Sequence, residues 1–195
     1  MNTLLNQTSE REKQREFEST VFEHARNLLA LINKLSVKEI DEKLGICSKT
    51  GGQKLLLLAP LVEVAWANGL MSVDEQIAIL SVAEEFDLKD QQSFWPLKNW
   101  LELEPAPSFF DLAWQRIERL RAILSSEDDV KFGFYLLNLV QFVAQQSDGR
   151  FLGSLRQPET QAIEQSTMME IYRRLRKFIA TPQAPVKLKF EVVSI

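Results

Sequence analysis

The sequence contains a single cysteine and a single histidine, and their scarcity excludes several kinds of site. With only Cys47, the chain cannot build an internal disulfide framework or a multi-cysteine zinc site. Any Ser-His-Asp or Cys-His catalytic arrangement would have to use His24. Because His24 falls on the apolar stripe of a helix, we expect a packed, hydrogen-bonded core or groove histidine. The sequence therefore predicts a protein that is not an enzyme.

Glycine, proline and net positive charge are also scarce. The chain has seven glycines and seven prolines among 195 residues, too few turn residues for an all-β fold of many short strands. Its formal net charge of −4 provides no overall basic field. Such a field is what holds a phosphate backbone, so we expect no general nucleic-acid binding.

Long apolar runs are missing as well. The stretch "LLLLAPLVEVAWA" (55–67) is too short and too interrupted to span a bilayer. The N-terminus turns densely charged at once and lacks the apolar core of a signal peptide. We therefore expect a soluble, cytoplasmic protein with no transmembrane segment, whose only route to a membrane is peripheral association.

Helical periodicity dominates what is present. Residues of a first long helix recur at spacings of three and four along one stripe: Phe17, Val21, His24, Leu28, Leu31 and Leu35. Ser36 and Glu39 have the spacing of a capping box that opens a short second helix ending near Leu44. Residues 53–67 are apolar on almost every face, which predicts a central, buried helix.

Further helices follow along the chain. Ser72 and Glu75 have the spacing of a second capping box. The helix that this box opens carries the apolar residues Val73, Ile77, Leu80 and Ala83. A shorter helix is expected over 94–103, with Ser93 as its cap and Pro96 in its first turn.

Three more helices complete the prediction. Ser108 is expected to cap a helix that runs to about Leu124. Asp128 or Asp129 is expected to start a second nearly all-apolar helix. The last helix begins at Pro158 and ends before "TPQAP". The predicted fold class is therefore all-α.

The C-terminal stretch "VKLKFEVV" alternates for most of its length, which is a strand pattern in an otherwise helical chain. A lone strand cannot satisfy its own backbone, so it should lie extended in a groove or pair with a second copy or a partner. We predict three parts: an N-terminal helical extension packed on the bundle (1–52), a helical domain (53–180) and an extended or β-like tail (181–195).

One structural device occurs twice in the chain. It is found in the stretches "VEVAWANGLMSVDEQIAIL" (62–80) and "VAQQSDGRFLGSLRQPETQAIEQ" (143–165). In each, a mostly apolar helix ends at Asn68 or Asp148, and a glycine follows that suits the left-handed backbone of a helix end. The next helix has Glu75 or Glu159 in its first turn, near the positive end of the helix. Two such hairpins predict a pseudo-twofold bundle.

These two stretches resemble the paired helix–loop–helix motifs of the TerB-like family, named for bacterial tellurite resistance. The resemblance covers about residues 53–180 and implies a compact all-α bundle of about seven to eight helices. Proteins of this family are mostly binding or accessory proteins tied to stress responses and membrane-associated complexes. The resemblance thus implies a non-enzymatic binding or scaffold protein that associates with a protein partner or with itself. Its tail or the bundle end around the turns would make the contact.

Oxygen-bearing side chains around the two turns are the candidates for a metal site: Asn68, Asp74, Glu75, Asp148 and Glu159. Hard divalent cations need several converging oxygens, which loops at a bundle end can supply. Each residue is also explained by helix capping or turn formation, and the alternating ligands of a calcium loop are missing. We expect no required cofactor, and the alternative function is a divalent-metal-binding sensor or a metal-dependent enzyme.

A dense basic cluster lies near the end of the last helix: Arg173, Arg174, Arg176 and Lys177. A solvated face at the negative end of a helix accounts for it, and the alternative is a docking patch for an acidic partner or anionic lipid headgroups. Four tryptophans are expected in the core: Trp66, Trp95, Trp100 and Trp114. Trp66 directly precedes the first turn, so a small-molecule binder with a pocket walled by Trp66 is a third hypothesis.

Overall fold

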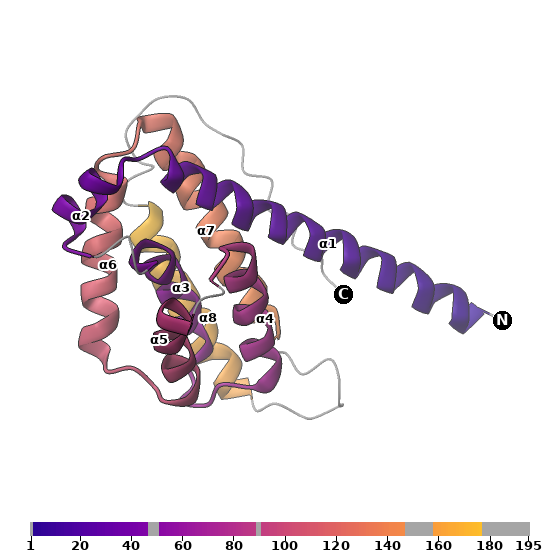
Figure 1. Cartoon of the computed structure of the whole chain (residues 1–195). Coiled ribbons are helices and arrows are strands. Elements are labelled where there is room, and N and C mark those ends of the chain that lie inside the picture. The colour runs from indigo at the N-terminus through magenta and orange to yellow at the C-terminus, as the bar shows by residue number, and fades with distance from the viewer. Residues whose placement is uncertain (1, 47–50, 89–90, 147–157, 177–195) are drawn as a thin grey trace.

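A computed structural model describes residues 2–46, 51–88, 91–146 and 158–176, in which every regular element is a helix. The helices are α1 (Asn2–Asn33), α2 (Val37–Leu44), α3 (Gly52–Ala65), α4 (Val73–Glu85), α5 (Gln91–Glu102), α6 (Pro107–Arg121), α7 (Ser126–Gln146) and α8 (Pro158–Arg176). They form the bundle drawn in Figure 1. The predicted all-α class is confirmed for these residues, whereas the predicted C-terminal strand lies outside them.

Helix α3 lies at the centre of the bundle. It packs against α4, α5, α6, α7 and α8. Its buried residues face every side of the helix: Leu55, Leu56, Leu57, Leu58, Ala59, Pro60, Leu61, Val62, Val64 and Ala65. The central, buried helix predicted over 53–67 is therefore confirmed, and it ends at Ala65.

Helix α7 is the second element of the core. It packs against α1, α3, α4 and α8, and the α1·α7 contact is the most extensive in the bundle. The part of α1 that docks buries Val21, Ala25, Leu28, Leu31 and Ile32. The N-terminal part of α1 projects beyond the bundle (Figure 1). No described helix is both long enough and apolar enough to cross a membrane.

Both predicted capping boxes are formed. At the start of α2, Ser36 Oγ accepts a hydrogen bond from Glu39 N at 3.2 Å, and Glu39 Oε2 accepts one from Ser36 N at 3.1 Å. At the start of α4, Ser72 Oγ accepts from Glu75 N at 3.2 Å, and Glu75 Oε2 accepts from Ser72 N at 2.6 Å. Each box satisfies two helix-terminal or flanking N–H groups that would otherwise lack partners.

The predicted starts of α6 and α7 are wrong. Ser108 does not cap α6, because the helix begins one residue earlier at Pro107, whose fixed φ and missing N–H suit a first helical position. Helix α7 begins before Asp128, because Ser125 Oγ accepts the hydrogen bond from Asp128 N at 3.1 Å. Asp128 and Asp129 lie instead in the first turn, beside the positive end of the helix.

Helix α5 also differs from the prediction. It is already helical at Gln91, so Ser93 lies inside it and Pro96 lies in its second turn. Its Trp95 is 69% exposed, so the expectation of a core residue is wrong there. Trp114 is buried at 4% exposure, as expected.

Candidate functional site

The turn between α3 and α4 is built by its own residues. Asn68 Oδ1 accepts a hydrogen bond from Leu70 N at 2.9 Å, which is the local bonding that favours Asn in turns. Gly69 has a φ of +78°, a backbone conformation that costs other residues steric strain. A Cβ at Gly69 would meet nothing within 4 Å, so the backbone and not the available space requires the glycine. The predicted turn at Asn68-Gly69 is confirmed.

Three of the five candidate metal ligands lie in described positions around this turn. Besides Asn68, Glu75 is fully buried with its carboxylate on Ser72 N, and Asp74 is exposed in the first turn of α4. Glu159 is the second residue of α8, and its side chain is not described; Asp148 lies outside the described residues. In the part of the chain that the structure covers, no three His, Cys, Asp or Glu side chains gather as metal ligands would. The metal site stays a prediction.

An exposed apolar surface lies beside the same turn. We name it the apolar ridge, and it consists of Leu70, Val73 and Ile77, which are 76%, 69% and 55% exposed. Val73 and Ile77 are one helical turn apart on α4, so they share a face. The buried face of α4 consists instead of Glu75, Ala78, Ile79, Val82 and Ala83. The apolar spacing of Val73 and Ile77 thus marks a solvent-facing stripe of the helix.

The predicted basic cluster on α8 divides into described and undescribed residues. Arg173 Nη1 forms an ion pair with Glu170 Oε2 at 3.2 Å, and the Arg173 side chain is 69% exposed. Arg174 points toward α6 and is 28% exposed. The side chain of Arg176 is not described, and Lys177 lies outside the described residues.

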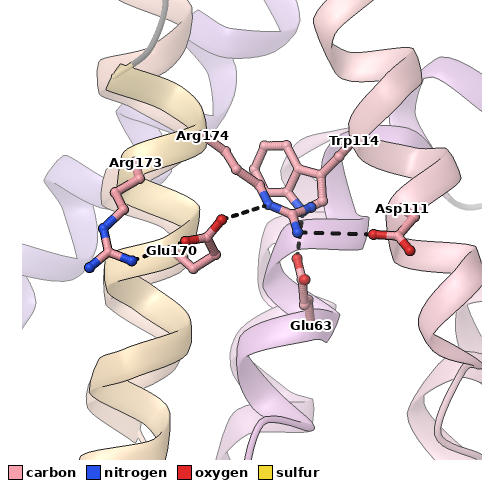
Figure 2. Close-up of polar contacts among 6 residues, drawn as sticks. All are labelled: Glu63, Asp111, Trp114, Glu170, Arg173 and Arg174. Carbon is pink, nitrogen blue, oxygen red and sulfur yellow. Dashed lines mark hydrogen bonds and ion pairs between the residues drawn. The ribbon is translucent and has the colours of Figure 1, made fainter.

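Arg174 belongs to a polar cluster that joins α3, α6 and α8 (Figure 2). We call it the Arg174 cluster, and it consists of Glu63, Asp111, Trp114, Glu170 and Arg174. The Arg174 guanidinium lies over the Trp114 ring, with Cζ 5.5 Å from the ring centroid. Arg174 Nε lies 3.5 Å from Glu170 Oε1, and Arg174 Nη2 lies 4.0 Å from Asp111 Oδ1. Trp114 Nε1 also donates a hydrogen bond to Glu63 Oε2 at 2.6 Å.

Glu63 is the electrostatically unusual member of the Arg174 cluster. Burial raises the pKa of its carboxyl above the ordinary value of 4.5, because desolvation penalises the charged form. The hydrogen bond from Trp114 and the charge of Arg174 oppose this rise in pKa, while the charges of Asp111 and Glu170 add to it. The cluster thus holds three carboxyl groups around one guanidinium that lies on an aromatic face.

Sequence reasoning identified only Arg174 of this cluster as a binding candidate, and it assigned Trp114 to the core. The other three members are single acidic residues on three different helices, separated by tens of positions. No local spacing connects them. Only the packing of α3 against α6 and α8 brings them together.

Two of the remaining candidates, His24 and Trp66, contact neighbouring helices. The His24 ring lies 5.2 Å from that of Phe134 and 5.4 Å from that of Tyr135, between α1 and α7. His24 Nδ1 is buried and makes no hydrogen bond within the described chain, so His24 is packed, but the expected hydrogen bonding is absent at this atom. Trp66 Nε1 donates to the Trp100 carbonyl at 2.8 Å, which ties α5 to the end of α3. Cys47 lies outside the described residues.

A scan against protein-family models found no match, and searches of curated proteins and of solved structures found no significant match either. The TerB-like resemblance therefore rests on the two motifs themselves.

Proposed function

We propose that the protein is a non-enzymatic binding or scaffold protein of TerB-like type, acting in a bacterial stress response or at a membrane-associated complex. The apolar ridge carries this proposal, because it holds three large aliphatic side chains in solvent beside the turn that resembles the first TerB-like motif. Single exposed apolar residues are ordinary on protein surfaces, whereas neighbouring ones mark interaction sites. The partner is expected to be a protein that covers Leu70, Val73 and Ile77.

The environment of the only histidine supports a role without catalysis. General acid–base and nucleophilic mechanisms need a side chain held in hydrogen-bond reach of its reaction partner. His24 Nδ1 has no such partner among the described residues, and two aromatic rings flank the imidazole. Its surroundings are those of a helix–helix contact.

Site-specific photo-crosslinking in cells tests the proposed interface. A benzophenone amino acid at Ile77 should give a discrete adduct, because a partner lies on the ridge. The same amino acid at Glu102, an exposed residue at the end of α5, should give none. The Ile77 adduct should disappear when Leu70→Glu places a charge beside the crosslinker. Equal labelling from both positions, or no adduct from Ile77, would contradict the proposal.

A further inference from the structure

The Arg174 cluster contains the elements with which proteins bind a guanidinium group. A guanidinium is recognised by an aromatic face for its plane and by carboxylates at its edge. Trp114 supplies the face, and Asp111 and Glu170 supply the carboxylates. We propose that this cluster is a binding site for an arginine side chain of a partner protein, and that Arg174 is an internal occupant which the incoming arginine displaces.

The aromatic platform is held independently of Arg174. Trp114 is only 4% exposed, and its Nε1 donates a hydrogen bond to Glu63 Oε2 at 2.6 Å (Figure 2). The hydrogen bond fixes the indole within its plane, so the ring can keep its orientation when the guanidinium leaves. Such preorganisation reduces the cost of binding a ligand.

Arg174 itself is held loosely. Its polar contacts, at 3.5 Å to Glu170 and 4.0 Å to Asp111, are long against the roughly 2.7–2.9 Å of charge-assisted hydrogen bonds. Glu170 also pairs with Arg173 at 3.2 Å, so it is shared between two arginines. A guanidinium that enters from outside is not tethered to α8 and can align two of its N–H groups with one carboxylate.

Arg121 is a buried structural arginine of the same fold, with which Arg174 can be compared. The Arg121 side chain is 2% exposed and forms a bidentate ion pair with Asp129, with Nε–Oδ1 at 2.5 Å and Nη2–Oδ2 at 3.0 Å. It also donates to the Leu175 carbonyl at 2.9 Å. Arg174 is 28% exposed and has no contact of this kind. The contrast indicates that the Arg121 guanidinium stays in its site, whereas another guanidinium can replace that of Arg174.

Displacement of Arg174 does not require α8 to move. Ile171, three residues before Arg174, and Leu175, the residue after it, are 1% and 2% exposed and hold the helix on the bundle. The Arg174 side chain can therefore swing into solvent by rotation about its own bonds. Its departure leaves Glu63, Asp111 and Glu170 with one positive charge fewer, so the vacated site attracts another cation.

The site should discriminate between cations. A lysine ammonium is a compact, strongly hydrated charge, whereas a guanidinium is planar, stacks on indole and binds carboxylates with two parallel hydrogen bonds. The buried indole therefore favours arginine over lysine. This proposal is independent of the apolar ridge, because no residue is shared between the two surfaces.

The test uses the full chain and a peptide probe, acetyl-Gly-Gly-Arg-Gly-Gly-amide. Binding is followed by the indole N–H resonance of Trp114, assigned from its loss in Trp114→Phe. An internal occupant that fills a site about nine-tenths of the time weakens apparent affinity about tenfold, so Arg174→Ala should bind the probe about tenfold more tightly than wild type. Arg173→Ala is the matched control, because it also removes one positive charge beside Glu170 but vacates no place on Trp114, so it should change the affinity far less than Arg174→Ala does.

Three further binding measurements test the specificity of the site. The lysine analogue of the peptide should bind Arg174→Ala several-fold more weakly than the arginine peptide does. Asp111→Asn in the Arg174→Ala background should lower the affinity, and free arginine should bind less well than the peptide because its own carboxylate meets like charges. Tighter binding of free arginine would overturn the assignment to a protein partner.

Other results would overturn the site itself. These are an unchanged or lower affinity in Arg174→Ala, or equal binding of the lysine and arginine peptides. If the NMR spectrum of Arg174→Ala shows that this variant does not fold, Arg174→Lys is used instead, because it keeps the aliphatic chain and the positive charge but removes the planar guanidinium. The gain in affinity for the arginine peptide is then required of Arg174→Lys. Loss of the Ile77 crosslink in cells would leave all these results unaffected.

Discussion

Arg121 of α6 and Asp129 of α7 form a buried bidentate ion pair, with Nε–Oδ1 at 2.5 Å and Nη2–Oδ2 at 3.0 Å. The third hydrogen bond of the guanidinium, to the Leu175 carbonyl, lies in the last turn of α8. One side chain therefore joins three helices. It also satisfies a carbonyl at a helix end that lacks an intrahelical partner.

We expect Asp129→Ala to lower the free energy of unfolding by about 3–5 kcal/mol, because it leaves the Arg121 charge buried without its partner. Urea denaturation measures the change. Lys131→Ala, which breaks the exposed pair with Glu127, is the control and should have no measurable effect. A cost for Asp129→Ala no larger than that of the control would show that Arg121 finds another partner.

Two isoleucines of α4 that differ in burial should differ in their contribution to stability. Ile79 is fully buried, so Ile79→Ala should destabilise the protein by about 2–5 kcal/mol. Ile77 is 55% exposed, so Ile77→Ala should change stability by no more than about 0.5 kcal/mol. The comparison is made by urea denaturation of the isolated protein. A large loss for Ile77→Ala would mean that the ridge packs within the chain and is not free for a partner.

The buried carboxyl of Glu63 should make stability depend on pH in a defined direction. Since its pKa is raised in the folded protein, the folded state binds the proton more readily than the unfolded chain. The stability contributed by this proton is complete below the ordinary value of 4.5 and is lost as the pH rises through the folded pKa. Glu63→Gln keeps an acceptor for Trp114 and removes the buried charge. It should therefore be more stable than wild type at neutral pH and lose this advantage at about pH 4.

Urea denaturation of both proteins across this pH range isolates the contribution of Glu63, because all other groups are common to them. A wild type that is the more stable protein at neutral pH would show that the attraction between Glu63 and Arg174 outweighs the cost of burial.

His24 should contribute a pH dependence of the opposite sign. Desolvation lowers its pKa below the ordinary value of 6.5, and the charge of Glu23 opposes this shift in part. As the pH falls below 6.5, the unfolded chain takes up the proton first, so stability is lost until the folded pKa is passed. His24→Phe, which suits the site between Phe134 and Tyr135, should show a shallower loss of stability between about pH 7 and pH 5 than wild type. Parallel curves for the two proteins would contradict this prediction.

The turns predict the response to metal ions. Asn68 Oδ1 and the Glu75 carboxylate already accept backbone N–H groups, so we expect Ca²⁺, Mg²⁺, Mn²⁺ and Zn²⁺ to leave the thermal midpoint of metal-stripped protein unchanged. An ion bound only by the folded state would add about 2.7 kcal/mol at a hundredfold excess over its dissociation constant. A rise in the midpoint that Asp148→Ala abolishes would establish the alternative metal-binding function.

The parts of the fold that could be predicted are those that neighbouring residues determine. The boxes at Ser36 and Ser72 depend on residues three positions apart, and α3 is recognisable because it is apolar on all faces. The start of α6 was mispredicted because two local signals compete, Ser108 as a cap and Pro107 as a first helical residue, and the proline prevails.

What could not be predicted depends on contacts between distant segments. Ile77 has the spacing of a core residue, and only the packing of α4 decides that Ala78 and Ile79 face inward. The Arg174 cluster likewise depends on distant segments, because Glu170 and Arg174 share α8 while Glu63 and Asp111 come from α3 and α6. In the sequence, Glu63 is an isolated acidic residue within an apolar helix. Its hydrogen-bond donor, Trp114, comes from α6.

The docking of α1 on α7 has a consequence for synthesis on the ribosome. Lys34, just after α1, bonds to Asp128 of α7, 94 positions further along the chain. At about 5–20 residues per second, the end of α1 is translated roughly 5 to 20 seconds before the start of α7. During that interval the face carrying Val21, Leu28 and Ile32 has no α7 to cover it. We therefore expect chaperones that bind apolar segments near the exit tunnel to recognise the nascent N-terminal helix.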